Sequence, residues 1–250
     1  MAKEFKIIRL EEVDSTNNEI KRRGDSLDNL SVIITNKQTA GRGQVGNKWL
    51  SPPGENLTFS ILLRPGSDGL PAIKAAEQFL ISRIATLSVS DLLEEMGIKC
   101  RIKWPNDIYV GNKKICGMLI ENTLSFENVA STIVGIGLNV NQEIFSPELM
   151  NPTSMYKVSG EKYGLEDCLQ GILKNFALYM ALVGGKEEDI KEKYLSRLYR
   201  RGELSDFRDI KEDKVFKGKI KGVAENAKLI VEMPDGSDKE FAFKEISYII

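Results

Sequence analysis

Histidine is absent from this sequence of 250 residues. Its absence excludes Ser-His-Asp and Cys-His catalysis, histidine-ligated metal sites and imidazole general bases. Cysteine is scarce: Cys100, Cys116 and Cys168 are widely spaced and form no CxxC pair. A zinc site or a disulfide framework is therefore not expected. Each cysteine is interpreted as a small buried hydrophobe in a reducing compartment.

The sequence also lacks long apolar runs and a charge excess of either sign. Its first residues, Met1 to Lys6, carry charges but no apolar h-region, and no run approaches the length of a membrane span. The net charge of −1 gives no general attraction to nucleic acid or anionic lipid. With 42% hydrophobic and 28% charged residues, the composition is that of a folded protein. We expect a cytoplasmic protein without a membrane partner.

Periodicity and turn residues divide the chain into short strands and helices. Strands are predicted at residues 5–10, 31–35, 56–63, 99–104, 107–110, 115–121 and 130–140. A capping box of Thr16 and Glu19 predicts a helix over 16–22. Pro71 is predicted to open a long amphipathic helix that runs through Leu92, and two further helices are predicted at 165–183 and 187–200.

The composition changes after Gly202, where apolar and polar residues begin to alternate around turns. Before that point, strands and helices are mixed without strict βαβ alternation. We therefore predict an α+β protein with two domains. Residues 1–202 are expected to form a mixed β-sheet flanked by helices, and residues 203–250 a small SH3-like β-barrel.

The segment Gly41–Gly46 matches GxGxxG in its letters but not in its context. A dinucleotide-binding fingerprint needs a helix directly after the glycines, and Asn47–Pro53 cannot begin one. A P-loop is excluded because Asn47 stands where that motif needs lysine. Two interpretations remain open: a mobile surface loop, or a flexible loop whose exposed amides bind phosphates together with Arg42 and Lys48.

A second pattern joins Lys103–Asp107 to Lys113–Gly117 through a short apolar strand and a glycine turn. It predicts a β-hairpin that directs a lysine into a binding site rather than into bulk water. A lysine held in this way neutralises carboxylate and phosphate oxygens together, as the activation of an acid by ATP requires. Taken alone, Lys114 is better interpreted as a solvated hairpin lysine, and the Ser15–Asn17 segment as a simple helix cap.

Considered together, these patterns resemble the biotin protein ligases, also called biotin–[acetyl-CoA-carboxylase] ligases, almost from end to end. The order and spacing of the segments carry the resemblance. The matching segments are Asp14–Asn17, Gln38–Gly43, Lys103–Asp107, Lys114–Glu121 and Gly135–Asn141, followed by the β-rich tail.

The resemblance implies a class II synthetase-like fold and a reaction in two steps. Biotin is the substrate, and ATP with Mg²⁺ activates its carboxylate as biotinyl-5′-AMP with release of pyrophosphate. A lysine of the biotin carrier domain of a carboxylase then accepts the biotinyl group. No covalent enzyme intermediate forms, which suits a chain without histidine.

The resemblance also implies roles for individual residues. Catalysis is expected from Lys114, which would contact the carboxylate and the α-phosphate, and from Arg42. Asp107 is a candidate for Mg²⁺ binding or for chemistry at the acceptor lysine. Biotin is expected to contact Ser15, Thr16, Asn17, Gln38, Arg42, Gly43, Gln44, Lys114 and Gly117. ATP or the adenylate is expected to contact Arg42, Gln44, Trp49, Lys103 and Asn139.

The sequence departs from the family pattern in its glycine loop. The family commonly has GRGRxGR, whereas Gln44 and Asn47 occupy the two later arginine positions here. Phosphate binding is then expected to rest on Arg42, backbone amides and Lys48. Some members carry an N-terminal helix-turn-helix, but the match here begins near residue 5, so no DNA binding is expected. Members include monomers and homodimers, and a homodimer is one expected state.

Two other functions remain to be separated from this one. A lipoate–protein ligase shares the architecture, but its glycine-rich motif ends in His-Asp, which cannot occur in a chain without histidine. A non-catalytic biotin or nucleotide sensor could use the same scaffold. Intact Lys114, Arg42 and Asn139 argue against a sensor.

Overall fold

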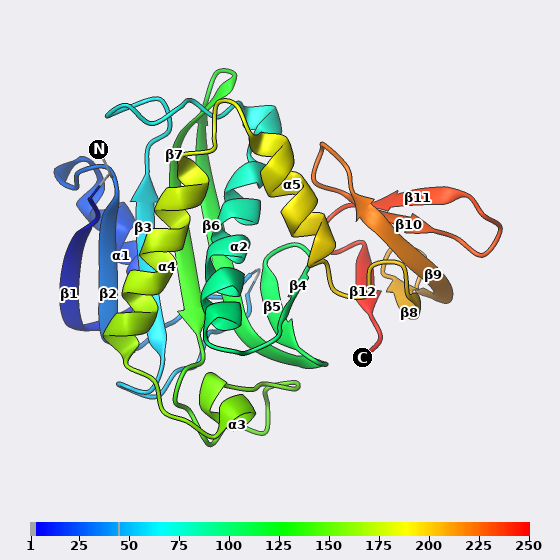
Figure 1. Cartoon of the computed structure of the whole chain (residues 1–250), viewed down its shortest axis with the longest axis horizontal. Coiled ribbons are helices and arrows are strands. Elements are labelled where there is room, and N and C mark those ends of the chain that lie inside the picture. Colours follow the sequence, from blue (N-terminus) through cyan, green and yellow to red (C-terminus); the bar gives the residue numbers. More distant parts are fainter. Residues whose placement is uncertain (1–3, 45) are drawn as a thin grey trace.

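A computed structural model describes residues 4–44 and 46–250 of the chain (Figure 1). Its largest element is a seven-stranded mixed sheet in the order β1-β2-β3-β7-β6-β5-β4. The first two strands are parallel, and the other neighbours pair antiparallel. The strands are β1 (Lys6–Val13), β2 (Ser31–Gln38), β3 (Leu57–Leu63), β4 (Arg101–Lys103), β5 (Asp107–Val110), β6 (Lys113–Ser125) and β7 (Asn128–Leu138).

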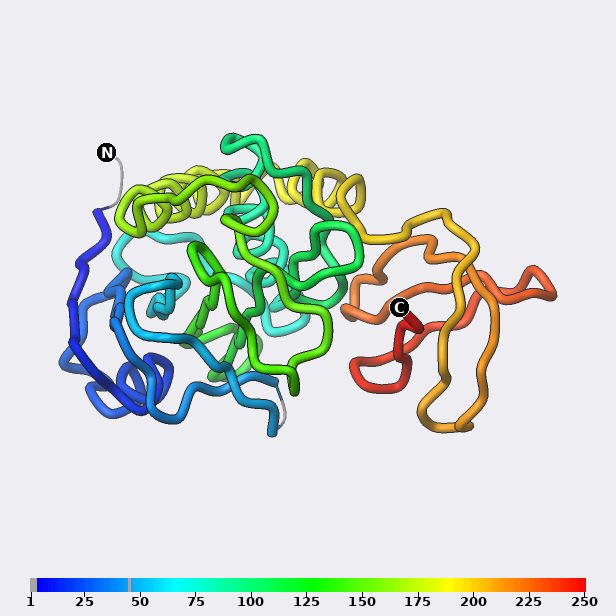
Figure 2. The backbone as a smooth tube through the Cα atoms, turned by 90° about the horizontal axis from the view of Figure 1, so that it is seen from below, coloured from blue at the N-terminus to red at the C-terminus, as the bar shows by residue number. Residues whose placement is uncertain are grey.

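Helices cover the two faces of this sheet unequally. In Figure 2, α4 and α5 (yellow-green to yellow) run along one side of the sheet, where α2 packs against them. The short helix α1 lies on the opposite side, against β2, β3 and β7. No helix within the described residues is both long and apolar enough to cross a membrane. The helices are α1 (Thr16–Arg23), α2 (Phe79–Glu95), α3 (Met155–Ser159), α4 (Leu165–Met180) and α5 (Glu187–Ser196), with 3₁₀ turns at Gly24–Ser26 and Ala75–Glu77.

The central strand β3 shows how the sequence separates the two faces. Its side chains alternate, so Phe59 and Ile61 enter the large core beneath α2 and α4. Ser60 points to the opposite face, where it contacts α1. A second, smaller core lies beneath α1 and contains Ile20, Leu27, Ile33, Leu62 and Ile133. This face is only partly covered by apolar side chains, which leaves room for a polar site.

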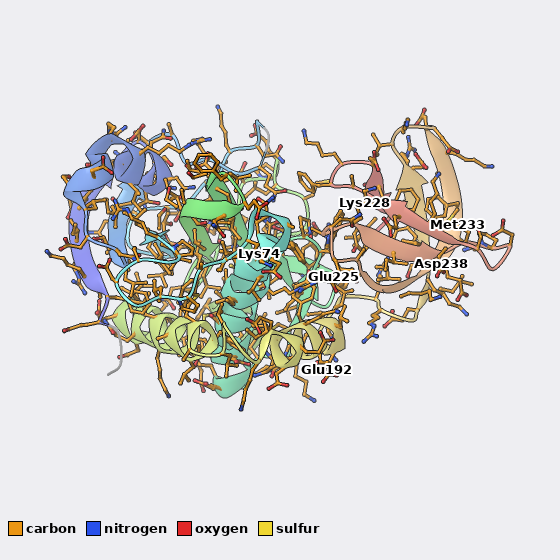
Figure 3. All side chains as sticks on the ribbon, turned by 90° about the horizontal axis from the view of Figure 1, so that it is seen from above. Lys74, Glu192, Glu225, Lys228, Met233 and Asp238 are labelled. Carbon is orange, nitrogen blue, oxygen red and sulfur yellow. The ribbon has the colours of Figure 1, made fainter. Side chains whose placement is uncertain are left out.

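The C-terminal part of the chain forms a separate five-stranded antiparallel sheet in the order β11-β10-β9-β8-β12. Figure 3 shows Glu225 and Lys228 on the side of this sheet that faces the larger one, with Met233 and Asp238 farther away. The predicted small all-β unit is thus confirmed, while the exact division at residue 202 stays a prediction. The strands are β8 (Leu204–Asp209), β9 (Lys214–Val223), β10 (Leu229–Glu232), β11 (Asp238–Phe241) and β12 (Ile246–Tyr248).

The segment between the two sheets is tied to the free edge of β4. The amide of Ile102 donates to the Arg197 carbonyl at 2.9 Å, and the amide of Tyr199 donates back to the Ile102 carbonyl at 2.8 Å. Just after the same strand, the indole of Trp104 donates to the carbonyl of Ala227 at 3.0 Å. The edge of the larger sheet is therefore closed by chain rather than exposed to solvent.

The predicted start of the long helix was wrong. Residues 71–74 are not helical, and α2 begins at Phe79. The reason is backbone pairing, because Val129 donates to the Ile73 carbonyl at 2.9 Å and Ala75 donates to the Glu127 carbonyl at 2.7 Å. The helix is also not amphipathic. It is buried on nearly all sides, since α4 and α5 cover the side that turns away from the sheet.

The predicted capping box was also wrong. The N-cap of α1 is Ser15, and its side chain makes no cap hydrogen bond. Glu19 instead bonds to the guanidinium groups of Arg22 and Arg23. The short helix α3, which has no strong apolar period, was not predicted. The three cysteines are free and buried, as expected.

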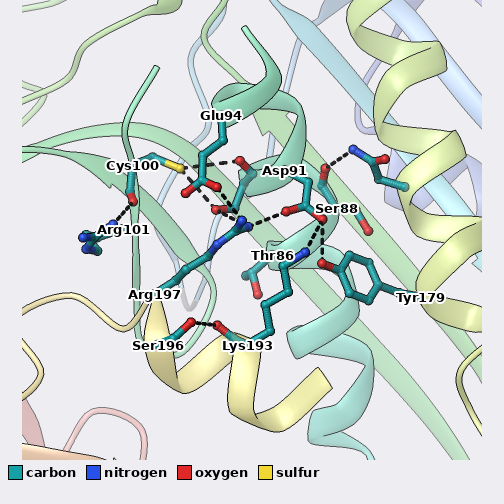
Figure 4. A network of polar contacts seen from close by, with 12 residues as sticks. Thr86, Ser88, Asp91, Glu94, Cys100, Arg101, Tyr179, Lys193, Ser196 and Arg197 are labelled. Carbon is teal, nitrogen blue, oxygen red and sulfur yellow. Dashed lines mark hydrogen bonds and ion pairs between the residues drawn. The ribbon is translucent and has the colours of Figure 1, made fainter. Parts of the chain in front are cut away.

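A polar network joins the three helices on the covered face (Figure 4). The Asp91 carboxylate on α2 accepts hydrogen bonds from Tyr179 on α4, from Lys193 on α5 at 3.0 Å, and from Arg197 just after α5 at 2.6 Å. Burial raises the pKa of Asp91, but these hydrogen bonds outweigh it, so the net pKa lies below the usual value. Asp91 thus links α2 to α4 and α5, and Glu94 on α2 adds a second pair with Arg197.

Replacing Asp91 with alanine is expected to lower the free energy of unfolding by about 3 kcal/mol, because it removes the partly buried carboxylate that accepts from Lys193, Arg197 and the Tyr179 hydroxyl. Urea unfolding at neutral pH measures this loss. The loss should be complete above about pH 4, the unfolded pKa of aspartate, and should shrink as the pH falls through the lower native pKa. Asp28→Ala removes only the exposed Lys6–Asp28 pair and should change stability little. Equal losses for both variants would contradict the account.

Candidate active site

A cavity of about 140 Å³ opens on the α1 side of the large sheet, beneath the glycine loop. Five separate stretches of chain meet around it: the start of α1, the end of β2 with the glycine loop that follows, strand β3, the β5–β6 hairpin and strand β7. All but two of the residues predicted for the site line this cavity. They are Ser15, Thr16, Asn17, Gln38, Arg42, Gly43, Gln44, Trp49, Asp107, Lys114 and Gly117.

One end of the cavity is a wall of buried, uncharged polar groups. The amide and hydroxyl of Thr16 donate to the side-chain oxygen of Gln38 at 2.8 and 3.3 Å. Ser60 lies behind them and donates at 2.6 Å to the Thr16 hydroxyl or to the side-chain oxygen of Asn17. These bonds fix the orientation of each group before any ligand binds.

The carboxylate of Glu121 anchors this wall from the side. It accepts from Asn17 at 2.8 Å, from Lys21 at 2.7 Å and from Arg42 at 3.0 Å. Burial raises the pKa of Glu121, but the bonds from Lys21 and Asn17 outweigh it and keep the net pKa below its usual value. Arg42 also donates to Asn18 at 2.7 Å. Its guanidinium therefore lies at the rim of the cavity, already engaged by Glu121.

Glycines in β7 make the floor of the cavity. A Cβ atom at Gly135 would collide with the side chain of Asn17, and one at Gly137 would collide with the indole ring of Trp49. Both side chains therefore lie directly on strand backbone, where only glycine leaves room. The Trp49 Nε1 atom is buried without a hydrogen-bond partner among the described residues. It is a donor still available to an acceptor group.

The other end of the cavity carries the charges. The Lys114 ammonium pairs with the carboxylate of Asp107 at 2.8 Å and lies 6.0 Å from the Trp49 ring. Its alkyl stem crosses Gly117, where a Cβ would come within 2.9 Å of it. The backbone of Lys114 is also fixed, since its amide donates to the Asn151 carbonyl at 2.8 Å. The predicted hairpin thus brings this lysine into the cavity.

Asp107 is the single carboxylate among the described residues that line this cavity. No group of three or more Cys, Asp or Glu side chains suited to hold a metal ion occurs among the described residues. An all-protein metal site therefore does not fit here. One carboxylate does fit Mg²⁺ that arrives bound to nucleotide phosphates, because Mg²⁺ usually takes one or two carboxylates plus phosphate oxygens.

The glycine loop is a small hairpin rather than an open phosphate cradle. Arg42 and Lys48 form an antiparallel bridge, and the amide of Gly43 donates to the Asn47 carbonyl at 2.7 Å. The amide of Trp49 donates to the Gly41 carbonyl at 2.9 Å. The expectation of freely exposed amides is wrong for these positions, because the hairpin uses them internally. Val45, within the GxGxxG match, lies outside the described residues.

Lys103 and Asn139 are the two predicted residues that do not line the cavity. The Lys103 ammonium lies over the rings of Tyr109 and Tyr248, at 5.2 and 4.6 Å from their centres. The side-chain amide of Asn139 donates to the Thr153 carbonyl at 2.9 Å. This bond fastens the end of β7 to the segment before α3. Both residues support neighbouring structure in this geometry.

The sequence interpretation missed Ser60 and Glu121 as parts of the site. The signal for Ser60 was present, because polar Thr58 and Ser60 alternate in an otherwise apolar strand. Glu121 had a weaker signal. It lies within the matched segment after Lys114, but only the fold brings it next to Asn17 and Arg42.

The chain is similar to known proteins over most of its length. A model of the "Biotin/lipoate A/B protein ligase family" matches residues 9–141. The "Bifunctional ligase/repressor BirA" of Bacillus subtilis is 32% identical over 219 residues, which are 85% of this chain and 64% of the relative. The chain thus spans less than two thirds of that relative. The "Biotin--[acetyl-CoA-carboxylase] ligase" of Paracoccus denitrificans is 30% identical over 205 residues, with 78% of this chain and 81% of the relative covered.

Solved structures give the same result for the fold. The structure of a biotin protein ligase from Aquifex aeolicus in complex with biotin and ATP superposes with a TM-score of 0.78. Its sequence is 31% identical, and the match covers 97% of each chain. The similarity includes the C-terminal five-stranded sheet as well as the large sheet, since nearly the whole of each chain is covered.

Replacing Gly137 with alanine is expected to displace the Trp49 ring and to cost roughly 1–3 kcal/mol of stability through overpacking. Fluorescence checks the displacement, because the chain has two tryptophans and a Trp49→Phe variant isolates the contribution of Trp49. The Trp49 emission should shift to longer wavelength. Gly185→Ala is the matched control, since nothing lies near its added Cβ. An unchanged Trp49 emission in Gly137→Ala would contradict the packing described here.

Proposed function

Because this chain belongs to the biotin/lipoate A/B protein ligase family, we propose that it acts as a biotin protein ligase. It activates biotin with ATP as biotinyl-5′-AMP and transfers the biotinyl group to a lysine of the biotin carrier domain of a carboxylase. One observation carries the proposal. A single cavity combines a buried wall of uncharged polar groups with a lysine–aspartate pair at its other end.

The uncharged wall suits the ureido ring of biotin. That ring is neutral and has a carbonyl acceptor and two N–H donors, so it needs fixed partners of both kinds. Thr16 and Gln38 supply hydroxyl and amide groups, Ser15 adds a hydroxyl that is not used for helix capping, and Asn17 adds a second amide. A site built to hydrogen-bond such groups strongly disfavours an analogue without them. Lipoate has no ureido ring.

The charged end suits the first chemical step. The biotin carboxylate attacks the α-phosphorus of ATP, the bond to the β-phosphate breaks, and pyrophosphate leaves. Negative charge gathers on the α-phosphate oxygens as the new bond forms. Lys114, which is held at the cavity by its pairing with Asp107, supplies a cation for that charge. Binding that strengthens in the transition state raises the rate of the step rather than the affinity alone.

The second step needs less from the protein. The amine of the acceptor lysine attacks the acyl carbon of the adenylate, loses a proton, and AMP leaves with the bonding electrons. Mg²⁺, when bound with the nucleotide, would be held by phosphate oxygens together with Asp107 and would neutralise part of their charge. Trp49 contributes a wall and an indole N–H that has no acceptor within the described part of the chain.

We also propose a protein partner, a cellular compartment and a domain division. The carrier domain of a carboxylase is the protein partner, and the cytoplasm is the compartment, consistent with three free buried cysteines. Residues 1–202 are proposed as the catalytic domain and 203–250 as a separate small domain.

The rival functions differ in a direct assay. The protein is incubated with ATP, Mg²⁺, labelled biotin and a biotin carrier domain, and label on the carrier is measured. A ligase labels the carrier, whereas a sensor binds biotin without labelling it. Replacing biotin with lipoate in ATP–pyrophosphate exchange separates the two ligases, and exchange with lipoate alone would overturn the assignment.

Lys114→Ala is expected to slow biotin-dependent ATP–pyrophosphate exchange by about 10²-fold or more, because a charge directed at the forming anion is lost. Exchange measured at saturating biotin and ATP tests this. Lys113→Ala is the matched control, since Lys113 is the adjacent residue on the same strand and is exposed. It should retain nearly full exchange. Near-normal exchange by Lys114→Ala would refute the proposed role.

A further inference from the structure

Lys103 occupies an unusual position for a charged side chain. Its ammonium lies 5.2 Å from the centre of the Tyr109 ring and 4.6 Å from that of Tyr248. No ion pair to a carboxylate of the described residues is formed by this group. Burial lowers the pKa of Lys103, as expected for a cation among aromatic rings. Its contacts are therefore mainly cation–π contacts.

These contacts join the two sheets. Tyr109 belongs to β5 of the large sheet, and Tyr248 belongs to β12 of the C-terminal sheet. Tyr199, from the connecting segment, lies between them, with its ring centre 5.5 Å from that of Tyr109 and 6.0 Å from that of Tyr248. Tyr248 in turn packs at 5.3 Å against Phe207 in the core of the C-terminal sheet. Lys103 contacts the rings on both sides of the junction between the two sheets.

Lys103 is also connected to the active site through Asp107. It lies opposite Asp107 in the antiparallel register of β4 and β5. Asp107 in turn pairs with Lys114 at 2.8 Å. A cavity of about 370 Å³ beside Lys103 shares Gln44 and Asp107 with the active-site cavity, and its other wall comes from the C-terminal sheet. Asp107 therefore faces both the reacting end of the site and the junction of the sheets.

From this geometry we propose that Lys103 is a positioning residue. It clamps Tyr248 onto the β4–β5 hairpin, so that the C-terminal sheet holds Asp107 in place, and Asp107 directs Lys114 toward the reacting carboxylate. The proposal rests on the proposed ligase function and extends it. The C-terminal sheet then influences adenylate formation without touching biotin, because Thr16 and Gln38 line the active-site cavity and not the cavity beside Lys103.

The test compares Lys103→Met with Lys103→Arg in biotin-dependent ATP–pyrophosphate exchange. Methionine keeps the length of the side chain but removes its charge, whereas arginine keeps a cation that also stacks on aromatic rings. We expect Lys103→Met to lower kcat about tenfold, in the range that small misplacements of reacting groups produce. The KM for biotin should stay within about twofold, because the biotin wall is not disturbed. Lys103→Arg should restore most of the lost kcat.

Tyr248→Leu provides an independent variant that removes the ring from the other side of the clamp. It should lower kcat to a similar extent, and the double variant with Lys103→Met should be no slower than either single variant, since both break the same contact. Lys113→Met is the control for loss of a lysine nearby and should keep the wild-type kcat. Thermal unfolding of each variant shows whether it is folded under assay conditions.

The outcomes separate the two proposals. A wild-type protein without biotin-dependent exchange would contradict the ligase function itself. With an active wild type, unchanged kcat in folded Lys103→Met would overturn the positioning role alone. A raised KM for ATP with unchanged kcat would also overturn it, and would assign Lys103 to direct phosphate binding instead. Failure of Lys103→Arg to restore kcat would rule out a cation–π clamp.

Discussion

The site depends on strand positions that have no side chain. Gly135 and Gly137 on β7, with Gly117 beside them on β6, leave a bare strip in the middle of an otherwise close-packed sheet. Three functional side chains lie on that strip: Asn17, Trp49 and Lys114. Any larger residue there would fill the cavity with the sheet's own atoms. The opposite face of the same strands packs into a dense apolar core. The sheet can therefore stay rigid while its other face carries a cavity.

A second constraint is electrostatic. Each carboxylate that faces the site already has a cation as partner: Glu121 with Lys21 and Arg42, and Asp107 with Lys114. An anionic substrate must therefore compete for these cations instead of finding them free. The competition is easiest where the cation has one partner and is partly exposed, as Lys114 is. Arg42 is held by two groups and contributes at the rim. The biotin end, in contrast, presents uncharged groups, and the charges of Glu121, Lys21 and Arg42 only anchor them from the side.

Much of this could be predicted from the sequence, because the strong local signals agree with the fold. Eleven of the thirteen residues that the family resemblance implied for the site line one cavity, and their roles stay a prediction. The failures have physical reasons. The helix predicted from Pro71 starts at Phe79 because the chain before it pairs with a distant hairpin. Lys103 lies one residue before Trp104, yet strand pairing at the sheet edge turns it toward the C-terminal sheet and away from the cavity. The pairing of Ile73 with Val129 and the contact of Lys103 with Tyr248 link residues far apart in the sequence, and periodicity carries no information about them.

One cavity is proposed to bind the biotinyl adenylate with its ureido ring at the polar wall and its phosphate at Lys114. A crystal structure of the protein soaked with biotin and ATP tests this binding mode. We expect a ligand with its ring oxygen and nitrogens bonded among Ser15, Thr16, Asn17 and Gln38, and with the Lys114 ammonium moved from Asp107 onto the acyl phosphate. A ligand bound elsewhere, or a Lys114 that remains on Asp107 while the adenylate occupies the cavity, would contradict it.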